Sequence, residues 1–485
     1  MTPDQYTPEE PISSIATALA PAALGIVRVS GKGCIELVSK VFSRPKALLD
    51  AAGNTLVYGW IIDDGKKIDE VMLAVYRAPK SFTGEDMVEI FCHGGPAVVM
   101  AIQKLMLKIG FRQANRGEYT FRAFINGKTD LTRAEAVKEI IDSHTDVSRS
   151  HAAGRLAGSL FEEIDSIKKL IIDTLAAIEV EIEYPEDEET IADSFDREDI
   201  ETAASRLQAL VDSWRGEKLY QDGARVVLAG RTNAGKSSLF NAILKEERAI
   251  VSDIEGTTRD WLESWASING IPVRLFDTAG LRQTSDVIEA QGVEISRNLV
   301  QDADVVLYLV DGTQGMNEED REFIEKCQEP LIVVYTKSDK TPDNTGRCGV
   351  SPLEGVVRSL TRTTEFPSET RTRGGLSPTL CKISSKTGQG LSELFSQIYQ
   401  ILTEGIAGGS TERSQAGLGS ARQKEAVSAA LESVRHALVS ADDNYTLDAV
   451  VQDLEDALDA LGQVTGDVTP DDVLGSIFAN FCVGK

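Results

Sequence analysis

The first part of the chain carries short hydrophobic runs that are broken by Gly, Asp and Pro. Residues 22–29 (AALGIVRV) form one such run, rich in the residues that strands favour. The stretch 97–109 (AVVMAIQKLMLKI) instead has the spacing of a helix. Further runs that predict strands are residues 56–62, 68–76 and 87–91. Together these elements predict a small α+β domain at residues 1–127.

From residue 131 onward, apolar residues recur at intervals of three and four positions. This spacing places them on one face and predicts a long amphipathic helix that ends at Tyr184-Pro185. Its apolar positions are Leu156, Leu160, Ile164, Ile167, Ile171, Leu175, Ile178 and Ile182. The same spacing returns before Gly462, in Leu447, Val451, Leu454, Leu458 and Leu461. We therefore expect a helical domain in two segments, residues 128–217 and residues 404–485.

Between residues 223 and 403, strand patterns alternate with helical patterns: ARVVLA, SSLFNAIL, VRLF, DVVLYLV, LIVVY and LSELFSQIYQIL. That alternation predicts a parallel sheet covered by helices on both faces, in a domain at residues 218–403. The economical arrangement inserts this α/β domain into one helical domain, because an insertion needs termini that lie close together. Two separate helical domains are the alternative. Residues 340–380 are rich in Thr, Ser, Arg, Gly and Pro, so we expect a long mobile loop there.

Composition and charge narrow the classes of function. A chain of 485 residues with 42% hydrophobic residues fits a soluble protein of several globular domains. The net charge of −26 excludes a protein that coats nucleic acid by bulk electrostatics, so any RNA contact must be local or shared with a partner. The six scattered cysteines show neither metal-site nor disulfide spacing. Since no signal peptide or membrane-spanning run is visible, we expect a cytoplasmic protein without membrane association.

Residues 230–237 (GRTNAGKS) match the phosphate-binding pattern GxxxxGK[ST] in full, after a predicted strand and at the start of a predicted helix. The glycines let backbone N–H groups wrap phosphates, and the helix N-terminus favours their negative charge. In this motif Lys236 reaches the β- and γ-phosphates, and Ser237 can bind Mg²⁺. A nucleoside triphosphate site is therefore predicted here.

The base is indicated by residues 336–339 (TKSD), which follow directly after the strand pattern LIVVY. The carboxylate of Asp339 can accept from N1–H and from the 2-amino group of guanine, whereas adenine offers neither donor. An unpaired buried carboxylate costs about 1–3 kcal/mol or more, so Asp339 predicts selection of GTP over ATP. Most GTPases have Asn where Thr336 stands; Thr keeps a hydroxyl but loses the amide. Residues 384–386 (SSK) resemble the next base-contacting loop.

Two further elements of a GTPase occur in the expected order. Residues 277–280 (DTAG) supply a DxxG motif, in which Asp277 holds Mg²⁺ through water and the Gly280 amide senses the γ-phosphate. Residues 256–260 (GTTRD) supply the switch threonine. Ras-like proteins orient the attacking water with a glutamine directly after DxxG. Here that residue is Leu281, which cannot position water, so either the chain only binds GTP or catalysis is arranged differently.

Over essentially its whole length the chain resembles the TrmE-type GTPases, also called MnmE. The resemblance rests on GRTNAGKS, on GTTRD, on DTAGLR followed by Glu289, on SFTGEDMVEIFCHGGP, and on the closing residues Phe481-Cys482-Val483-Gly484-Lys485. It implies a Ras-like P-loop G domain inserted in a helical domain. A folate-binding, aminomethyltransferase-like α+β domain would precede them and dimerise. Val483 is a mild departure, because the family usually has Ile there.

In this family the G domains of a homodimer meet when K⁺ binds, and the ion supplies the positive charge that an arginine finger would place. The resemblance implies K⁺ ligands at Asn233, Thr257 and the carbonyls of Ser252 and Ile254. It implies Mg²⁺ ligands at Ser237 and Thr258. The implied GTP contacts are Asn233, Ala234, Gly235, Lys236, Ser237, Ser238, Ser252, Asp253, Ile254, Glu255, Gly256, Thr257, Thr258, Asp277, Thr278, Ala279, Gly280, Thr336, Lys337, Asp339, Ser384, Ser385 and Lys386.

Glu289 matches the catalytic glutamate of the family, which orients the attacking water through a second, bridging water. Arg282 corresponds to a switch arginine, for which a solvent-exposed role is an equal alternative. Cys482 lies close to a flexible terminus, where a thiol could be reactive, and an inert cytosolic cysteine is the alternative. For His93 in FCHGGP we expect a structural turn rather than a metal ligand.

The resemblance also implies that the first domain binds a tetrahydrofolate derivative, 5-formyl- or methylene-tetrahydrofolate, as a one-carbon donor. The matching residues are Arg28, Glu89, Lys128 and Lys485. A carboxylate can hold the donor edge of the pterin, and the cations can meet its glutamate tail. Without the family, each of these residues is more simply interpreted as a surface charge.

The implied function is GTP hydrolysis in tRNA modification, with a FAD-dependent partner of the MnmG or GidA type in a heterotetramer and FAD only on that partner. The two proteins would install an aminomethyl or carboxymethylaminomethyl group at C5 of the tRNA wobble uridine. One alternative is a ribosome-assembly or translation GTPase, which would be expected to carry a basic RNA-binding domain. Another is a folate-binding module whose G domain is only regulatory.

Overall fold

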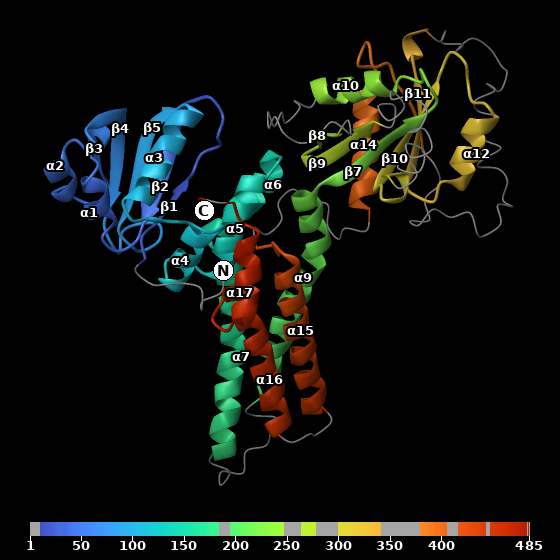
Figure 1. Cartoon of the computed structure of the whole chain (residues 1–485). Helices are drawn as coiled ribbons and strands as arrows, with labels where there is room; N and C mark the ends of the chain where they lie inside the picture. Colours follow the sequence, from blue (N-terminus) through green and yellow to red (C-terminus); the bar gives the residue numbers. More distant parts are fainter. Residues whose placement is uncertain are drawn as a thin grey trace. The chain divides into compact units, whose positions relative to one another are not determined.

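The computed structural model of the chain describes residues 10–183, 195–246, 263–277, 299–340, 379–404, 416–442, 447–482 and 484. The chain, coloured from end to end in Figure 1, divides into two compact units. Unit 1 contains Met1–Ile141, Ala152–Val211 and Gln415–Lys485. Unit 2 contains Asp142–His151 and Asp212–Ser414.

Unit 1 contains a six-stranded sheet with strand order β3-β4-β5-β2-β1-β6. Neighbouring strands are antiparallel except for the parallel pair β1 and β6. The strands are β1 (Ile12–Ile15), β2 (Ala22–Ser30), β3 (Thr55–Asp63), β4 (Lys66–Tyr76), β5 (Met87–Gly94) and β6 (Arg112–Gln113). The predicted strands at 22–29, 56–62, 68–76 and 87–91 are thereby confirmed.

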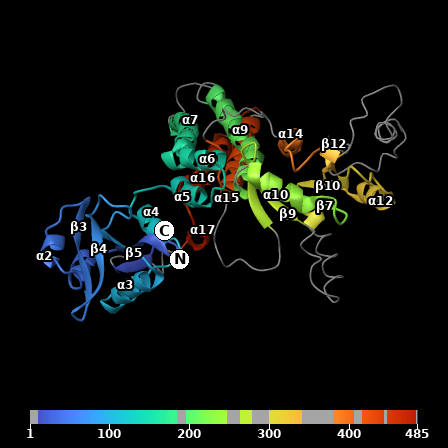
Figure 2. The ribbon, with the colours of Figure 1, turned by 90° about the horizontal axis from the view of Figure 1, so that it is seen from above.

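Helices cover one face of this sheet, as the alternation along β3 shows. Val57 and Ile61 are buried, whereas Leu56 and Tyr58 between them are exposed. The buried side chains form one core with α1 (Cys34–Ser39), α2 (Pro45–Leu49) and α3 (Pro96–Lys108), and Figure 2 shows α3 beside the strands. The helix predicted at 97–109 and the α+β character are confirmed.

The remainder of unit 1 is helical. The helices α7, α15 and α16 pack side by side (Figure 1). Near the sheet, α17 packs on α4 through a cluster that contains Phe121 and Phe478. The bounds are α4 (Glu118–Ile125), α5 (Leu131–Asp142), α7 (Ser159–Glu183), α15 (Ala421–Asp442), α16 (Leu447–Thr465) and α17 (Asp471–Ala479). Two more helices, α6 (Asp146–Ala157) and α9 (Arg197–Asp222), each have residues in both units.

Two details of the predicted helices were wrong. The long helix does not include Leu156, because Gly158 takes φ +113 and separates α6 from α7. The later helix does not stop at Gly462 but runs to Thr465. The Gly462 carbonyl accepts from the backbone N–H groups of residues 466–468, which follow the end of the helix. The apolar seam itself is confirmed at its centre, where residues such as Ile171 are fully buried.

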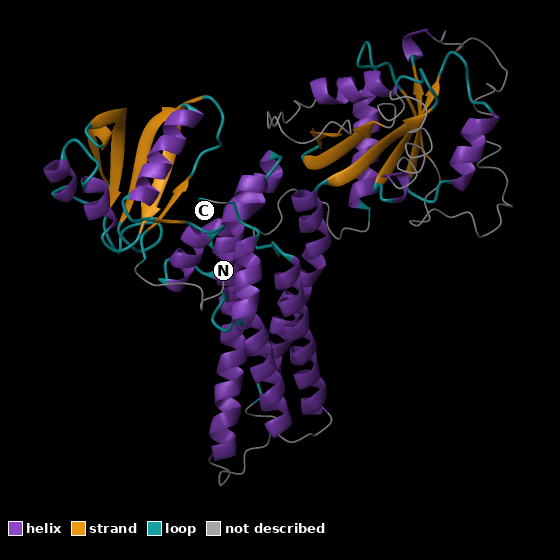
Figure 3. Cartoon of the chain, viewed as in Figure 1, coloured by secondary structure: helices purple, strands orange, loops and turns teal. Residues whose placement is uncertain are grey.

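Unit 2 is a six-stranded sheet with order β12-β11-β10-β7-β9-β8, covered by helices on both faces (Figure 3). One face packs against α10 (Lys236–Glu246) and α14 (Leu391–Thr403), and the other against α12 (Glu318–Lys326). The strands are β7 (Ala224–Gly230), β8 (Glu263–Ile268), β9 (Ile271–Asp277), β10 (Val305–Asp311), β11 (Leu331–Thr336) and β12 (Thr379–Lys382). The predicted two-sided α/β arrangement is confirmed.

The strands predicted for this sheet are parallel, as expected, but the sheet also contains β8, which was not predicted and runs antiparallel to β9. The two strands are joined by Asn269 and Gly270, both with positive φ, +50 and +87. Such a two-residue connection is the usual tight turn of a β-hairpin, which can only return the chain antiparallel.

The division between the units differs in detail from the expected boundaries. Helix α9 runs without interruption across the boundary expected between residues 217 and 218. Residues 142–151 belong to unit 2, in which the His144 ring stacks on Trp265 of β8 at 3.9 Å between centroids. Of the expected loop at 340–380, residues 341–378 lie outside the described residues. Among the described helices, none is both long and apolar enough to cross a membrane.

Candidate nucleotide site

The phosphate-binding loop lies between β7 and α10. Gly230 has φ +133 and Gly235 has φ +98, conformations that L side chains rarely adopt. A Cβ at Gly230 would also collide with the carbonyl oxygen of Leu309 on β10. Because α10 begins at Lys236, the loop presents backbone N–H groups and the positive end of a helix to an anion.

The first two residues of α10 have oxygen partners. The Nζ of Lys236 donates to the carbonyls of Gly230 at 2.6 Å and Arg231 at 2.8 Å. The hydroxyl of Ser237 donates to Oδ2 of Asp277 at 2.8 Å, at the end of β9. Asp277 is only 5% exposed. A hydroxyl and a carboxylate side by side are hard oxygen ligands, so this pair fits Mg²⁺.

The two loops predicted to contact the base lie together at the ends of β11 and β12. The hydroxyl of Ser384, which is fully buried, donates to Oδ1 of Asp339 at 2.8 Å. The backbone N–H of Ser338 donates to the Ile383 carbonyl at 3.1 Å. Asp339 itself is exposed, so its carboxylate is oriented by Ser384 while it stays accessible to a base. Ser385 and Lys386 follow in the same loop, with Lys386 exposed.

Thr336 connects the base side of the site to the phosphate side. Its hydroxyl donates to the carbonyl of Ala234 in the phosphate loop at 2.7 Å, and it lies 3.3 Å from the Val310 carbonyl. The side chain is 2% exposed. The hydroxyl that distinguishes Thr336 from an apolar residue therefore holds the loop, even without the amide of the usual Asn.

Asp311, at the end of β10, was missed by the sequence reasoning. Its Oδ2 accepts from Lys337 Nζ at 2.6 Å, and its Oδ1 accepts from the hydroxyl of Thr313 at 2.7 Å. Burial alone would raise the pKa of Asp311, but these hydrogen bonds and the Lys337 charge outweigh it and hold the pKa at about 2. The only sequence signal was an acidic residue at the end of the pattern DVVLYLV.

In unit 1, the structure brings together two of the expected folate residues. Arg28 Nη2 donates to Oε1 of Glu89 at 2.7 Å, and its Nη1 donates to the Gly484 carbonyl at 3.0 Å. The Tyr119 hydroxyl donates to the Arg28 carbonyl at 2.8 Å. Lys128 is exposed, and its Nζ donates to the Pro79 carbonyl at 3.0 Å.

Two further residues weighed in the sequence, Cys482 and His93, are described in unit 1. Cys482 is exposed, and its carbonyl accepts from the N–H of Gly117 at 3.4 Å. The expectation of a turn at His93 was wrong: the residue lies in β5, and its Nδ1 is 2.7 Å from Oδ1 of Asp69. Within the described ranges, no group of three or more His, Cys, Asp and Glu side chains could hold a metal ion.

Comparison with known proteins identifies the family. A model described as the GTP-binding protein TrmE N-terminus matches residues 11–128, and one described as the MnmE helical domain matches residues 131–482. The chain is 49% identical to the tRNA modification GTPase MnmE of Treponema denticola over 488 residues, which cover 99% of each chain. The chain belongs to the MnmE family of tRNA modification GTPases. It is also 44% identical to MnmE of Treponema pallidum over 500 residues (100% of each chain), and 39% identical to that of Borrelia turicatae over 481 residues (98% of each).

As an MnmE-family protein, the chain is a GTP hydrolase, and nucleotide use in this family implies Mg²⁺. Several of the expected site residues lie outside the described residues. They are Ser252, Asp253, Ile254, Glu255, Gly256, Thr257, Thr258, Thr278, Ala279, Gly280, Arg282, Glu289 and Lys485. Of the expected nucleotide-site residues, the structure therefore describes those of the phosphate loop, Asp277 and those of the two base loops.

Proposed function

We propose that this MnmE-family chain is a K⁺-dependent GTPase, activated when its G domains dimerise, that acts with a FAD-dependent partner on C5 of the tRNA wobble uridine. The modification adds an aminomethyl or carboxymethylaminomethyl group, with a tetrahydrofolate derivative as the one-carbon donor. One observation supports the GTPase part: two side-chain pairs that suit the two ends of a guanine nucleotide follow the C-terminal ends of parallel strands in the unit 2 sheet. There Ser237 meets Asp277, and Ser384 meets Asp339.

Recognition of guanine rests on Asp339. A carboxylate oriented by the Ser384 hydroxyl presents its remaining lone pairs to the N1–H and 2-amino donors of guanine. Adenine has no donor at these positions, so it leaves the carboxylate without a partner and loses binding energy. At the other end, Lys236 and the N–H groups of the phosphate loop bind the phosphates, and bound Mg²⁺ neutralises charge on their oxygens.

Hydrolysis needs a substitute for the water-orienting glutamine, because Leu281 has no polar group. Glu289 is proposed for this role on the family resemblance, with Arg282 as a second switch residue. The proposed K⁺ ligands are Asn233, Thr257 and the carbonyls of Ser252 and Ile254. Of these, Asn233 is described: it has φ +64 in the exposed part of the phosphate loop, where its side chain is accessible to an ion.

The proposed folate site centres on Arg28 and Glu89. Their side chains are 16% and 15% exposed, so the pair is mostly buried but still partly accessible to a ligand. The Arg28 guanidinium lies 5.8 Å from the centroid of the Phe82 ring and 5.5 Å from that of Tyr119. Tyr119 is fully buried, whereas Phe82 is exposed, so a carboxylate for the pterin donors near the Phe82 ring for its planar face is suitable chemistry for a folate. Lys128, Lys485 and the Cys482 thiol complete the proposed set.

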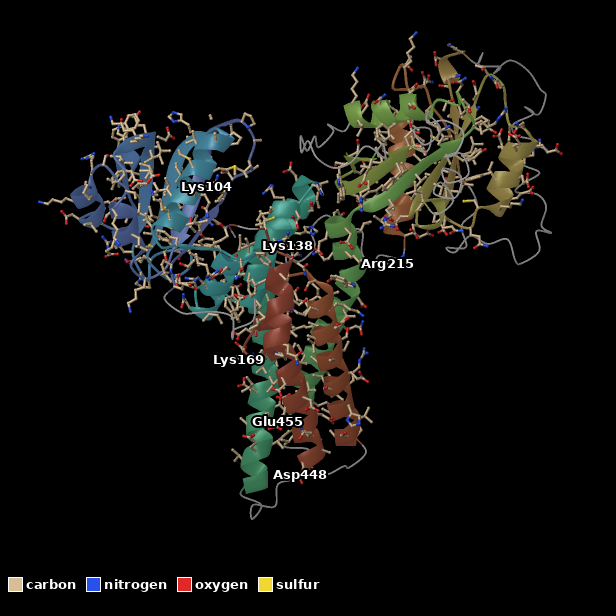
Figure 4. All side chains as sticks on the ribbon, in the orientation of Figure 1. Lys104, Lys138, Lys169, Arg215, Asp448 and Glu455 are labelled. Carbon is tan, nitrogen blue, oxygen red and sulfur yellow. The ribbon has the colours of Figure 1, made fainter. Side chains whose placement is uncertain are left out.

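The tRNA and the partner protein are proposed to share the RNA contact. In unit 1, Lys169 on α7 and Asp448 and Glu455 on α16 give the helices exposed charges of both signs (Figure 4). Such a mixed surface does not attract a polyanion strongly. A heterotetramer with a FAD-dependent protein of the MnmG type would supply the missing cationic surface, and a cytoplasmic location follows from that role. Light scattering of the mixed proteins tests it: two separate peaks would refute the heterotetramer.

The GTPase mechanism is tested by GTP turnover of the full chain in KCl and in NaCl. The variants are Glu289→Ala and, as a matched control, Glu318→Ala, which removes an exposed acid at the start of α12. We expect strong stimulation by K⁺, loss of turnover in Glu289→Ala with nucleotide binding retained, and normal turnover in the control.

Turnover that is the same in the two salts would refute the K⁺ assignment. Full activity of Glu289→Ala would remove Glu289 from the mechanism. Dimerisation is read in parallel by light scattering in KCl with a nonhydrolysable GTP analogue, where a monomer at all protein concentrations would contradict activation by dimerisation.

A further inference from the structure

Lys337 joins three loops of the nucleotide site. Its Nζ donates to Oδ2 of Asp311 after β10 at 2.6 Å, and to the carbonyl of Asn233 in the phosphate loop at 3.2 Å. Its own loop after β11 carries the base-reading Asp339. Lys337 also has φ +59, a left-handed conformation that is uncommon for a residue other than glycine. The side chain is therefore held in a specific place by partners on both sides.

Asp311 is the fixed end of this bridge. Its side chain is 9% exposed, against 36% for Lys337. Both the N–H and the hydroxyl of Thr313 donate to its Oδ1, at 2.9 and 2.7 Å. The backbone is fixed as well, because Asp311 pairs with Thr336 of β11 and the N–H of Gly312 donates to the Thr336 carbonyl at 3.0 Å. The carboxylate thus has one orientation, which leaves Oδ2 for Lys337.

We propose that Asp311 is a positioning residue for the nucleotide: acting through Lys337, it fixes the spacing between the phosphate loop and Asp339. This inference rests on the proposed guanine nucleotide site. A nucleotide must satisfy the phosphate loop and the base loops at the same time. If the phosphate loop and the base loops can move relative to each other, that motion is lost when the nucleotide binds, and the entropy cost weakens affinity. A charge-assisted hydrogen bond is stronger than the neutral bond between Thr336 and Ala234, so the bridge restrains the loops more firmly.

The ionisation of Asp311 supports this role. Burial would raise its pKa, but the hydrogen bonds from Lys337 and Thr313 hold it at about 2, so the group is charged throughout the neutral range. An Asn at position 311 keeps the shape and can still accept a hydrogen bond. It cannot neutralise Lys337, which is then drawn toward solvent and releases the Asn233 carbonyl.

A double-mutant cycle tests the proposal in the full chain, with the affinity for a fluorescent GDP in Mg²⁺ as the readout. The variants are Asp311→Asn, Lys337→Met and the double variant. We expect each single change to weaken binding about tenfold, or about 1.4 kcal/mol. We expect the double variant to bind about as weakly as either single one, because both changes break the same bridge. Asp320→Asn is the control, since Asp320 is also buried, at 1% exposed against 9% for Asp311, but pairs with Tyr308 and the N-cap of α12.

The outcomes separate the inference from the proposed function. Wild-type protein that does not bind guanine nucleotide would refute the site as a whole. Two results would overturn the role of Asp311 while leaving the proposed nucleotide site in place. One is an affinity of Asp311→Asn within about twofold of the wild-type affinity. The other is a loss of about a hundredfold in the double variant, which would mean that the two single effects are independent. An equal loss of affinity in Asp320→Asn would show that the effect is only structural.

A second cycle applies if thermal melting shows that Asp311→Asn does not fold. Thr313→Val removes the hydroxyl that orients Asp311, with little change in volume. We expect a two- to threefold loss of affinity in the wild-type background, equivalent to about half a kcal/mol. No further loss is expected in the Lys337→Met background. Equal losses in both backgrounds would contradict the proposal.

Discussion

A buried ion network around Arg122 in unit 1 gives a prediction about stability. Arg122 on α4 is fully buried, and its Nη1 donates to both carboxylate oxygens of Glu85, at 3.1 and 3.0 Å. Its Nη2 donates to Oε1 of the equally buried Glu118 at 2.9 Å and to the Glu10 carbonyl at 3.0 Å. Arg112 also donates to Glu118, at 2.5 Å, but its side chain is 29% exposed. The variants Arg122→Met and Arg112→Met therefore remove the same charge at two depths.

We expect Arg122→Met to destabilise unit 1 by about 3–5 kcal/mol, because it removes the buried cation that pairs with both Glu85 and Glu118 and leaves Arg112 alone beside Glu118. Arg112→Met should cost only about 1 kcal/mol, since water can replace the lost donor at a partly exposed position. In hydrogen exchange, each loss of about 1.4 kcal/mol in unfolding free energy lowers amide protection tenfold. Arg122→Met should therefore lower the protection of the α4 amides by about two to three and a half orders of magnitude. Arg112→Met should lower it by less than about one order.

The pH dependence of stability gives a second test of the same prediction. Burial alone would raise the pKa of Glu118, but hydrogen bonds from Arg112 and the Asn115 N–H, with the Arg122 charge, hold it below the ordinary 4.5. The native carboxylate is thus favoured, and its stabilisation is complete above pH 4.5 and lost as pH falls through the folded value. The cost of Arg122→Met should be greatest at neutral pH and shrink in acid. Equal losses in the two variants, or a cost that does not change with pH, would refute the reasoning.

Two other predictions concern the proposed folate site and the β8–β9 hairpin. Glu89→Gln should weaken binding of 5-formyl-tetrahydrofolate at least about tenfold in calorimetry, because a charged acceptor is lost, while the exposed Asp64→Asn does not; unchanged affinity in Glu89→Gln would remove it from the site. Trp265→Ala exposes His144, whose pKa is lowered mainly by burial, so an NMR titration should find that pKa closer to 6.5. Because the folded pKa of His144 lies below 6.5, its contribution to stability is present above that pH and lost as pH falls; the same pKa in both proteins would contradict this.

Elements with a strong local pattern could be predicted from the sequence. The strands that end in Gly230 and Thr336 contain the apolar runs VVLA and LIVVY, and their types and places are confirmed. The hairpin of β8 and β9 was missed although Asn269-Gly270 is a strong turn signal, because β8 (ESWASI) has too few apolar residues to be recognised as a strand. The break at Gly158 was missed because the apolar spacing passes through it unchanged.

Contacts between distant segments could not be predicted from patterns. The hydroxyl of Thr336 meets the Ala234 carbonyl across 102 positions, and Arg28 meets the Gly484 carbonyl across 456. Asp311 is one acidic residue among many until the sheet places it beside Lys337. The residues of the phosphate and base loops could be predicted from motifs, because each loop is a short stretch of consecutive residues. The network that holds them together depends on the fold.

We propose that this chain, a GTP hydrolase, selects GTP through Asp339. The most direct test is the rate of GTP and XTP hydrolysis by the wild type and by Asp339→Asn. Xanthine has an oxygen where guanine has its 2-amino group, so an Asn amide can donate to it where Asp cannot. We predict that the variant loses GTP hydrolysis by on the order of a hundredfold or more and gains hydrolysis of XTP. A variant that still hydrolyses GTP at the wild-type rate, with no gain for XTP, would contradict the account.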